Sequence, residues 1–356
     1  MKVRTLLVDS SYLLQRSVYG AKDTFTLKFG HIGGVYSFFT TIRKLIKEHK
    51  INKVVLVWNG ENSGRLRYYI NENYKANRKS KEWFKKIQLS EEEIKREKEK
   101  EESILKQKVR IQAYAEELYL RQIEVDTIEA DDLIAAYCMR HYNDEEIFLF
   151  SNDRDFIQLL DLNIKIILPN ADQPLTKVNF ILFYDYYYLN ALTIKIICGD
   201  NSDNIKGVEG IKEKLLLKYF PELKYRHVLI KEICAKAKEI NDERIKNGKK
   251  PIKALENLLK NIPLLKTNYK LLNLKEPFLN DAALEALEQL DMPLSIYDEN
   301  GKNERGKCLY KMMVEEDDFI SVYKGSFINY IEPFFTVIAR ERELYKEFIK
   351  KSNSKT

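Results

Sequence analysis

Short, unbroken runs of apolar residues stand out in the first half of the chain. They are TLLVD (5–9), KVVLVW (53–58), IFLFS (147–151) and IKIIL (164–168). A strand with one face in water alternates apolar and polar residues, whereas continuous runs indicate strands that are buried on both faces. The pattern therefore predicts a mainly parallel sheet that is covered by helices.

Helical periodicity fills the intervals between these runs. It is clear over residues 35–49 and 130–142, and the alternation of strands and helices predicts an α/β architecture. Residues 79–122 differ from the rest of the first half. Within them, SEEEIKREKEKEESILKQKVRIQAYAEEL (90–118) is highly charged with sparse apolar positions, which predicts one long helix with a solvated middle supported by charge pairs one turn apart. From about residue 180 onward the patterns become mainly helical.

Two segments of the second half have patterns of their own. Residues 241–254, NDERIKNGKKPIKA, predict an exposed, basic break between helices. The aromatic segment FINYIEPFF (327–335) predicts helical core in preference to a docking surface.

Composition narrows the class of protein. The 356 residues are enough for roughly two or three domain-sized units, and the net charge is +6. No apolar run approaches the roughly 20 residues that span a membrane, and the N-terminal run predicts a first strand, not a signal peptide. The chain has four widely spaced cysteines and no CxxC pair, which argues against a zinc site or disulfides and favours the cytoplasm: Cys138, Cys198, Cys234 and Cys308.

Acidic residues gather where predicted strands end and predicted helices begin. They form four groups: Asp9; Glu129, Asp131 and Asp132; Asp153 and Asp155; Asp200 and Asp203. One acid at such a position is usually a helix cap. The carboxyl ends of parallel strands share one edge of a sheet, so these groups are expected to meet there. Clustered carboxylates repel each other unless cations neutralise them, and Mg²⁺ or Mn²⁺ would do so with oxygen ligands.

A basic, tyrosine-rich segment follows the second apolar run. If this segment is helical, Tyr74 and Arg78 share one face with Lys75 beside them. An aromatic ring can stack on an unpaired base, and the two basic side chains can hold phosphate. The alternative is an ordinary basic surface.

A glycine-containing turn lies between two helical patterns further along. In GVEGI, Gly207 and Gly210 would let backbone approach a phosphate, with charge added by Lys212 and Lys214. The alternative is a simple turn between helices.

Five motifs, in this order, resemble those of the 5′ nuclease (flap endonuclease) family, and within it the phage members that act as ribonuclease H on primers. The resemblance covers most of residues 1–220 and rests on VDSSYLL, YKANR, IEADDLIA, SNDRDF and GDNSDNIKGVEGI. It implies a PIN-like α/β nuclease core over residues 1–185, with a helical arch at about 70–120. It further implies a helix-three-turn-helix for duplex binding over 186–270 and a C-terminal helical region over 271–356.

The resemblance also implies roles for single residues. The eight acids named above match the family's metal-binding acids, with Asp9 and Asp153 among the catalytic groups. Lys75 and Arg78 match residues that position the scissile phosphate, and Tyr74 belongs to the same arch motif.

The implied activity is structure-specific 5′ nuclease action, both 5′→3′ exonuclease and flap endonuclease, with primer removal in phage DNA replication. Two Mg²⁺ or Mn²⁺ ions would serve as cofactors. The implied partners are DNA and RNA–DNA junctions with a 5′ single strand, with replisome or single-strand-binding proteins as candidates. We expect a monomer in the cytoplasm, the host's if the gene is a phage gene, without membrane contact.

Two departures from the family pattern bear on these expectations. Asn59 stands where the family has a metal-binding aspartate, so it is expected to be a weaker ligand. It is either an engineered change, a natural one for which the other acids suffice, or a sign of lost catalysis. Lys212 stands where the family often has a third glycine, which disfavours a bound monovalent cation at this turn.

Two other kinds of protein remain open. One is a non-catalytic protein that binds flap or junction DNA on the same fold. The other is a small, toxin-like PIN ribonuclease, against which the GVEGI turn and the long charged segment argue.

Overall fold

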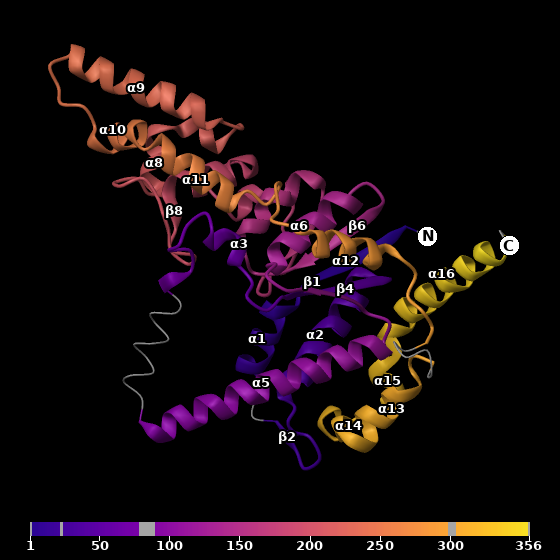
Figure 1. Cartoon of the computed structure of the whole chain (residues 1–356). Coiled ribbons are helices and arrows are strands. Elements are labelled where there is room, and N and C mark those ends of the chain that lie inside the picture. Colours follow the sequence, from indigo (N-terminus) through magenta and orange to yellow (C-terminus); the bar gives the residue numbers. More distant parts are fainter. Residues whose placement is uncertain (1, 22–23, 78–89, 298–303, 355–356) are drawn as a thin grey trace.

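A five-stranded, all-parallel sheet forms the centre of the protein (Figure 1). The computed structural model describes residues 2–21, 24–77, 90–297 and 304–354. The strand order is β5-β4-β1-β6-β7. The α/β fold predicted from the apolar runs is confirmed, with strands β1 (Val3–Asp9), β4 (Lys53–Asn59), β5 (Arg121–Val125), β6 (Glu145–Phe150) and β7 (Lys165–Ile167).

Both faces of the sheet are covered, which explains why the apolar runs are unbroken. Leu7 and Leu149 belong to one core, beneath α6 (Ala130–His141), η1 (Arg154–Leu162) and α7 (Ala191–Cys198). Leu6 and Phe148, one residue earlier on each strand, belong to the other core. That second core is built with α1 (Ser10–Gly20), α2 (Gly33–His49) and α5 (Glu91–Glu117).

Strand β5 was not predicted, whereas the long charged helix predicted over residues 90–118 is confirmed as α5. Helix α5 ends at Glu117, and β5 follows at Arg121. This edge strand alternates polar and apolar residues, so it lacks the continuous apolar run of the inner strands. Arg121 is nevertheless buried, because its guanidinium pairs with Glu341 at 2.5 Å.

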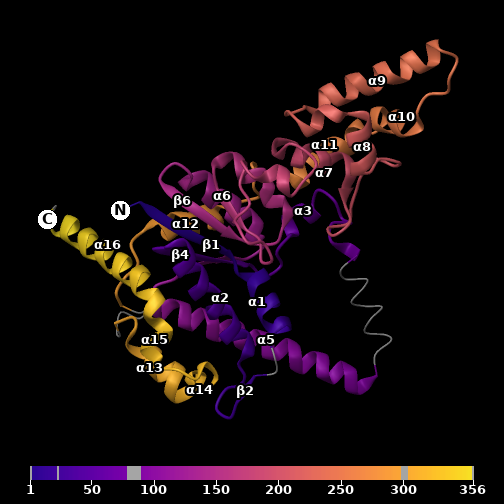
Figure 2. The same ribbon diagram turned by 180° about the vertical axis from the view of Figure 1, so that it is seen from behind.

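Helix α5 starts with a capping box in which Ser90 and Glu93 bond each other's backbone N–H groups. Its first half is charged and mostly exposed, whereas Ile111 and Tyr114 in the second half are fully buried. Figures 1 and 2 show the helix crossing the molecule on the side of α1 and α2, with its N-terminal half extending past them.

The second half of the described chain is mainly helical, as predicted. Helices α9, α10 and α11 project from the sheet as an arm, far from the C-terminal helix (Figures 1 and 2). The break predicted over 241–254 is shorter than expected, because α9 continues to Lys246 and α10 starts at Lys253. The elements are α8 (Glu213–Tyr219), α9 (Ile230–Lys246), α10 (Lys253–Lys260), α11 (Ile262–Leu272), α12 (Asp281–Asp291), α13 (Lys307–Tyr310), η5 (Lys311–Glu316), α14 (Phe319–Tyr323), α15 (Phe327–Ile331) and α16 (Phe335–Asn353).

The C-terminal helices pack on the same sheet. Tyr330 and Phe334, in the segment predicted as helical core, are buried in the core that contains α2 and α5. None of the helices in the described ranges is long and apolar enough to cross a membrane. The remaining short elements are β2 (Phe25–Thr26), β3 (Gly30–His31), α3 (Arg65–Tyr68), η2 (Phe180–Leu182), η3 (Tyr188–Asn190), β8 (Gly199–Asp200), β9 (Ile205–Lys206), η4 (Pro221–Lys224) and η6 (Glu332–Phe334).

Candidate active site

Acidic side chains converge at the carboxyl edge of the sheet, around the end of the central strand β1. Asp9 caps α1 by accepting the Tyr12 backbone N–H at 3.0 Å, and its other oxygen accepts the Ser151 hydroxyl at 3.0 Å. A cavity of about 540 Å³ opens beside it. Seven of the predicted site residues line this cavity: Asp9, Asn59, Lys75, Glu129, Asp131, Asp153 and Asp203.

The charge in this cavity is strongly negative. Burial raises the pKa of Asp9 to about 6, and the charge of Asp153 adds to the effect. Burial, followed by the charges of Asp153 and Asp9, raises the pKa of Asp131 well above its ordinary value. Such mutual effects mark carboxylates that lack a sufficient counter-charge.

Within the described ranges, no three or more His, Cys, Asp or Glu side chains are already grouped as a metal-binding cluster. The carboxylates share the cavity, but several are bonded to other parts of the chain. Their oxygen donors suit hard divalent cations. The residues present therefore fit such ions chemically, while binding would require some side chains to move.

Glu129, just before α6, is held by three side chains. The Lys75 ammonium and the Arg67 guanidinium contact its two oxygens, and the Tyr74 hydroxyl donates to Oε2 at 3.0 Å. Burial acts to raise the pKa of Glu129, but the charges of Lys75 and Arg67 outweigh it and the pKa lies below its ordinary value. Since Tyr74 is buried by these contacts, its ring is not open for stacking on a base in this structure.

The helical spacing considered for the basic segment is absent. Residues 72–75 form turns, and Lys75 has a positive φ of 53°, so Tyr74 and Lys75 do not lie on a helix. Arg78 lies outside the described residues. The Lys75 side chain still reaches the acidic cavity, which is the placement that its proposed role needs.

The segment around Lys75 is fixed to the turn that follows α7. The Lys75 backbone N–H donates to the Asp203 carbonyl at 2.9 Å, and the Asn77 amide donates to the Asn201 carbonyl at 2.8 Å. Two motifs that are more than a hundred residues apart thus form one wall of the cavity.

Asp132 does not face the cavity. Its carboxylate accepts two bonds from the Arg67 guanidinium, at 2.5 and 2.9 Å, and a third from the Phe278 backbone N–H at 2.9 Å. Asp132 is only 1% exposed, and Arg67 also bonds the Leu271 carbonyl at 3.0 Å. Arg67 was missed in the sequence analysis, because no local pattern links it to acids more than sixty residues away.

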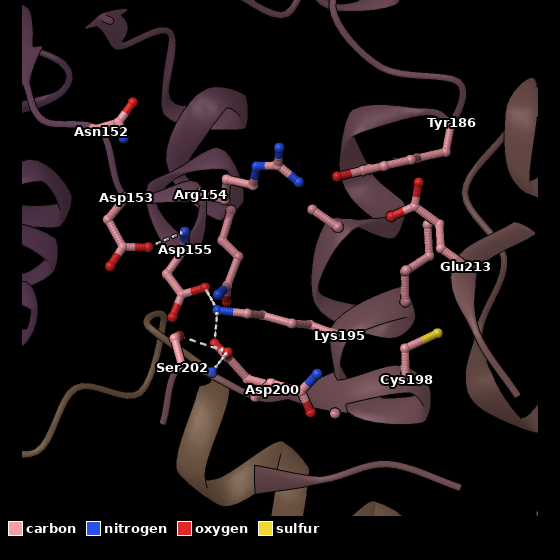
Figure 3. A pocket seen from close by; sticks show the side chains of 15 residues that line it. Asn152, Asp153, Arg154, Asp155, Tyr186, Lys195, Cys198, Asp200, Ser202 and Glu213 are labelled. Carbon is pink, nitrogen blue, oxygen red and sulfur yellow. Dashed lines mark hydrogen bonds and ion pairs between the residues drawn. The ribbon is translucent and has the colours of Figure 1, made fainter. Parts of the chain in front are cut away.

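Asp155 and Asp200 lie in an adjoining cavity of about 410 Å³, which also contacts Asp153 (Figure 3). Lys195, a second residue that the sequence analysis missed, lies between them. Burial raises the pKa of Asp155 to about 6 although Lys195 opposes this effect. For Asp200 burial is outweighed by Lys195, and the pKa lies below its ordinary value.

Asn59 has a structural contact of its own. Its side-chain oxygen accepts the Ala130 backbone N–H at 2.8 Å, in the first turn of α6, and its backbone N–H donates to the Ser11 hydroxyl at 2.9 Å. An aspartate could accept the same bond and would add a negative charge to the cavity.

The glycines of the GVEGI turn serve the packing of the chain on itself. A Cβ at Gly207 would lie 2.1 Å from the backbone carbon of Cys198, so only glycine fits there. Gly210 has a positive φ of 83°, a conformation that favours glycine. Lys212 and Lys214, at the start of α8, are exposed and free to meet a ligand.

This fold is that of a known class of nuclease. Residues 4–185 match the family model described as the 5′-3′ exonuclease N-terminal resolvase-like domain. The chain therefore belongs to the 5′-3′ exonuclease family, and the resemblance predicted from its motifs is confirmed.

Curated relatives point the same way. A 5′-3′ exonuclease of Mycoplasmopsis pulmonis is 28% identical over 298 residues, which cover 80% of this chain and 90% of that protein. The thermostable DNA polymerase I of Thermus thermophilus is 30% identical over 217 residues, covering 60% of this chain and 23% of the polymerase.

Solved structures show the shared fold. Bacteriophage T5 5′-exonuclease with bound divalent zinc ions has a TM-score of 0.57 at 21% identity, covering 81% of this chain and 96% of that one. A bacteriophage T5 flap endonuclease complex with DNA and metal ions has a TM-score of 0.58 at 18% identity, covering 88% and 99%.

Proposed function

We propose that this protein is a structure-specific 5′ nuclease that hydrolyses phosphodiesters near a 5′ end with two divalent ions. The observation that carries the proposal is the meeting of Asp9, Asp131 and Asp153 at one cavity in a chain of this family. These residues come from three separate elements, and burial, followed by the charges of Asp153 and Asp9, raises the pKa of Asp131. That arrangement is costly for folding alone and is explained by a cation that binds there.

The ligand sets follow from the two cavities. Asp9, Asp131 and Asp153 would hold the first ion, and Asn59 and Glu129 line the same cavity. Asp155 and Asp200, which line the adjoining cavity, would hold the second ion, and Asp203 would complete this site from the first cavity. When bound, two such ions activate a water molecule and neutralise the leaving oxygen of a phosphodiester.

Lys75 supplies the positive charge for the phosphate. Its ammonium is bonded to Glu129 in the same cavity. We propose that it turns to the scissile phosphate when a substrate is bound, together with Arg78. A fixed cation aimed at the developing charge stabilises the transition state.

The proposed substrate is a flap or junction with a 5′ single strand, including RNA–DNA primers in phage replication. The exposed Lys212 and Lys214 would contact the phosphates of the duplex, within a duplex-binding region over 186–270. Residues 1–185 would form the nuclease core, with an arch over about 70–120, and 271–356 a C-terminal helical region. Backbone contacts of this kind ignore sequence and weaken steeply with added salt.

The direct test is digestion of a 5′-flap DNA with Mg²⁺ or Mn²⁺, using Asp153→Asn as the inactive control. The proposal predicts short products from the 5′ end with the unaltered protein, and none with EDTA or with the control. Intact substrate under all metal conditions would refute the nuclease proposal for this form of the chain.

Asn59 favours one alternative, a protein that binds flap or junction DNA without cutting it. An amide in place of a carboxylate lowers the negative charge of the cavity, which weakens divalent binding. An Asn59→Asp variant separates the two. If both forms bind flap DNA and neither cleaves it, the protein is a binding protein without nuclease activity. If only the variant cleaves flap DNA, Asn59 is the residue that prevents cleavage.

A further inference from the structure

The Asp155–Asp200 pair already has a cation, and it belongs to the chain itself. The Lys195 ammonium lies 2.6 Å from Asp200 Oδ2 and also contacts Asp155 Oδ1 (Figure 3). Its side chain is 23% exposed, so the contact is made at the wall of the cavity and not in bulk solvent.

The remaining oxygen of Asp200 is bonded as well. Asp200 Oδ1 accepts the Ser202 backbone N–H at 2.7 Å and the Ser202 hydroxyl at 2.6 Å. Both carboxylate oxygens of Asp200 thus have partners, Ser202 at Oδ1 and Lys195 at Oδ2. A divalent ion that takes this pair has to replace the ammonium.

The first set of carboxylates differs in this respect. Among the described residues, no lysine or arginine forms an ion pair with Asp9, Asp131 or Asp153, although all three line the neighbouring cavity. Lys75 lies in the same cavity but is bonded to Glu129, so an ion can bind these three carboxylates without displacing a cation that is paired with them. The two halves of the acidic edge are therefore unequal before any ion binds.

The positions of the helices place Lys195 beside the Asp155–Asp200 pair. Lys195 lies on α7, five residues before Asp200, and Asp155 lies at the start of η1 against the same helix. The packed elements therefore hold the backbone of Lys195 within reach of both carboxylates before any ion binds.

We infer that Lys195 is a built-in counter-ion that occupies the second cation position of the metal-free protein and makes the two divalent sites unequal. The first ion binds directly; the second binds only when it displaces Lys195. The inference rests on the proposed function in that it concerns the cation positions of the proposed nuclease.

Counting bound Mn²⁺ tests it without any nucleic acid, so a failure to cut DNA has no bearing on the outcome. Free Mn²⁺ is measured by electron paramagnetic resonance during titration of the full chain. The variants are Lys195→Met and, as a matched control, Lys218→Met, which removes the same charge from an exposed position on α8. The expected result is one tighter and one weaker site in the unaltered chain and in the control.

In Lys195→Met the weaker site should tighten by roughly tenfold or more, since a charge-assisted bond no longer competes with the ion. An unchanged or weaker second site in this variant would overturn the inference. So would two equal sites in the unaltered chain.

A thermal measurement covers the case in which Lys195→Met folds poorly without metal. The two acids then face each other unneutralised, so Mn²⁺ should raise the melting temperature of this variant more than that of the unaltered chain. The double variant Lys195→Met/Asp200→Asn should lose this extra rise, because the pair no longer repels. Equal rises in all three proteins would contradict the role given to Lys195.

Discussion

Replacing Arg67 by methionine should destabilise the whole nuclease core, although Arg67 does not line the acidic cavity. The guanidinium links α3 to Glu129 and Asp132 at the start of α6 and to the Leu271 carbonyl at the end of α11. Its side chain is 5% exposed, and those of the two acids are 4% and 1% exposed. The substitution would leave two carboxylates buried, with one of their cations gone.

The expected loss follows from these contacts. Removing one partner of a buried ion pair costs about 3–5 kcal/mol, because the other charge stays buried without compensation. Arg67 bonds both acids. In the variant, Glu129 would still be bonded to Lys75, whereas the Asp132 carboxylate would retain, among the described residues, only the Phe278 backbone N–H as a partner. We therefore place the loss in the free energy of unfolding near the upper end of that range.

The dependence on pH has a definite sign. Burial raises the pKa of Asp132 in the native protein and Arg67 opposes the rise, so the pKa should climb further in the variant. When the pKa of a carboxyl group is higher in the folded than in the unfolded protein, the contribution of that group to the free energy of unfolding is lost as the pH rises through the folded pKa. The gap between the variant and the native protein should therefore widen from acidic to neutral pH.

Urea unfolding followed by far-ultraviolet circular dichroism measures this loss. Arg65→Met is the matched control. Among the described residues, the exposed Arg65 side chain bonds only the Tyr69 hydroxyl, so its loss should stay within about 0.5 kcal/mol. Equal losses in the two variants, or a loss in Arg67→Met that does not depend on pH, would contradict the role assigned to Arg67.

Three further predictions concern the site and the turn. Burial raises the pKa of Asp9 to about 6. The contribution of Asp9 to the free energy of unfolding, up to roughly 3 kcal/mol, is therefore complete below its ordinary pKa and is lost as the pH rises through about 6. The melting temperature of the metal-free protein should fall over that interval, and a flat profile would contradict this. Lys75→Ala should lower the rate of flap cleavage by roughly 10²–10³-fold, and an unchanged single-turnover rate would exclude its role at the phosphate. Gly207→Ala places a Cβ 2.1 Å from the backbone of Cys198 and should lower both the melting temperature and duplex affinity, whereas Gly20→Ala meets nothing within 4 Å; equal behaviour of the two variants would count against the packing role of Gly207.

The inner strands could be predicted because burial on both faces leaves a plain trace in the sequence. Strand β5 could not, since Arg121, Gln122 and Glu124 give it the pattern of a polar segment. Arg121 is buried because α16 brings Glu341 to it, from 220 residues away, and because the Leu290 and Met292 carbonyls also accept from its guanidinium. An ion pair between such distant residues has no local signal.

The acids of the site show the same limit. Asp131 and Asp132 are adjacent and chemically identical, yet successive residues of a helix point about 100° apart. One of them lines the cavity, and the other is bonded to Arg67 on another side of α6. The sequence therefore predicted that acids would gather at this edge, but the partners Arg67 and Lys195 that distinguish them emerge only from tertiary contacts.

The proposed nuclease site requires that carboxylates from separate elements meet at one edge of the sheet to hold divalent ions for phosphodiester hydrolysis. Anomalous diffraction from crystals soaked in Mn²⁺ tests this requirement. We expect a manganese peak among the carboxylates of Asp9, Asp131 and Asp153. No peak in this cavity at saturating Mn²⁺, or peaks only at unrelated surface acids, would contradict it.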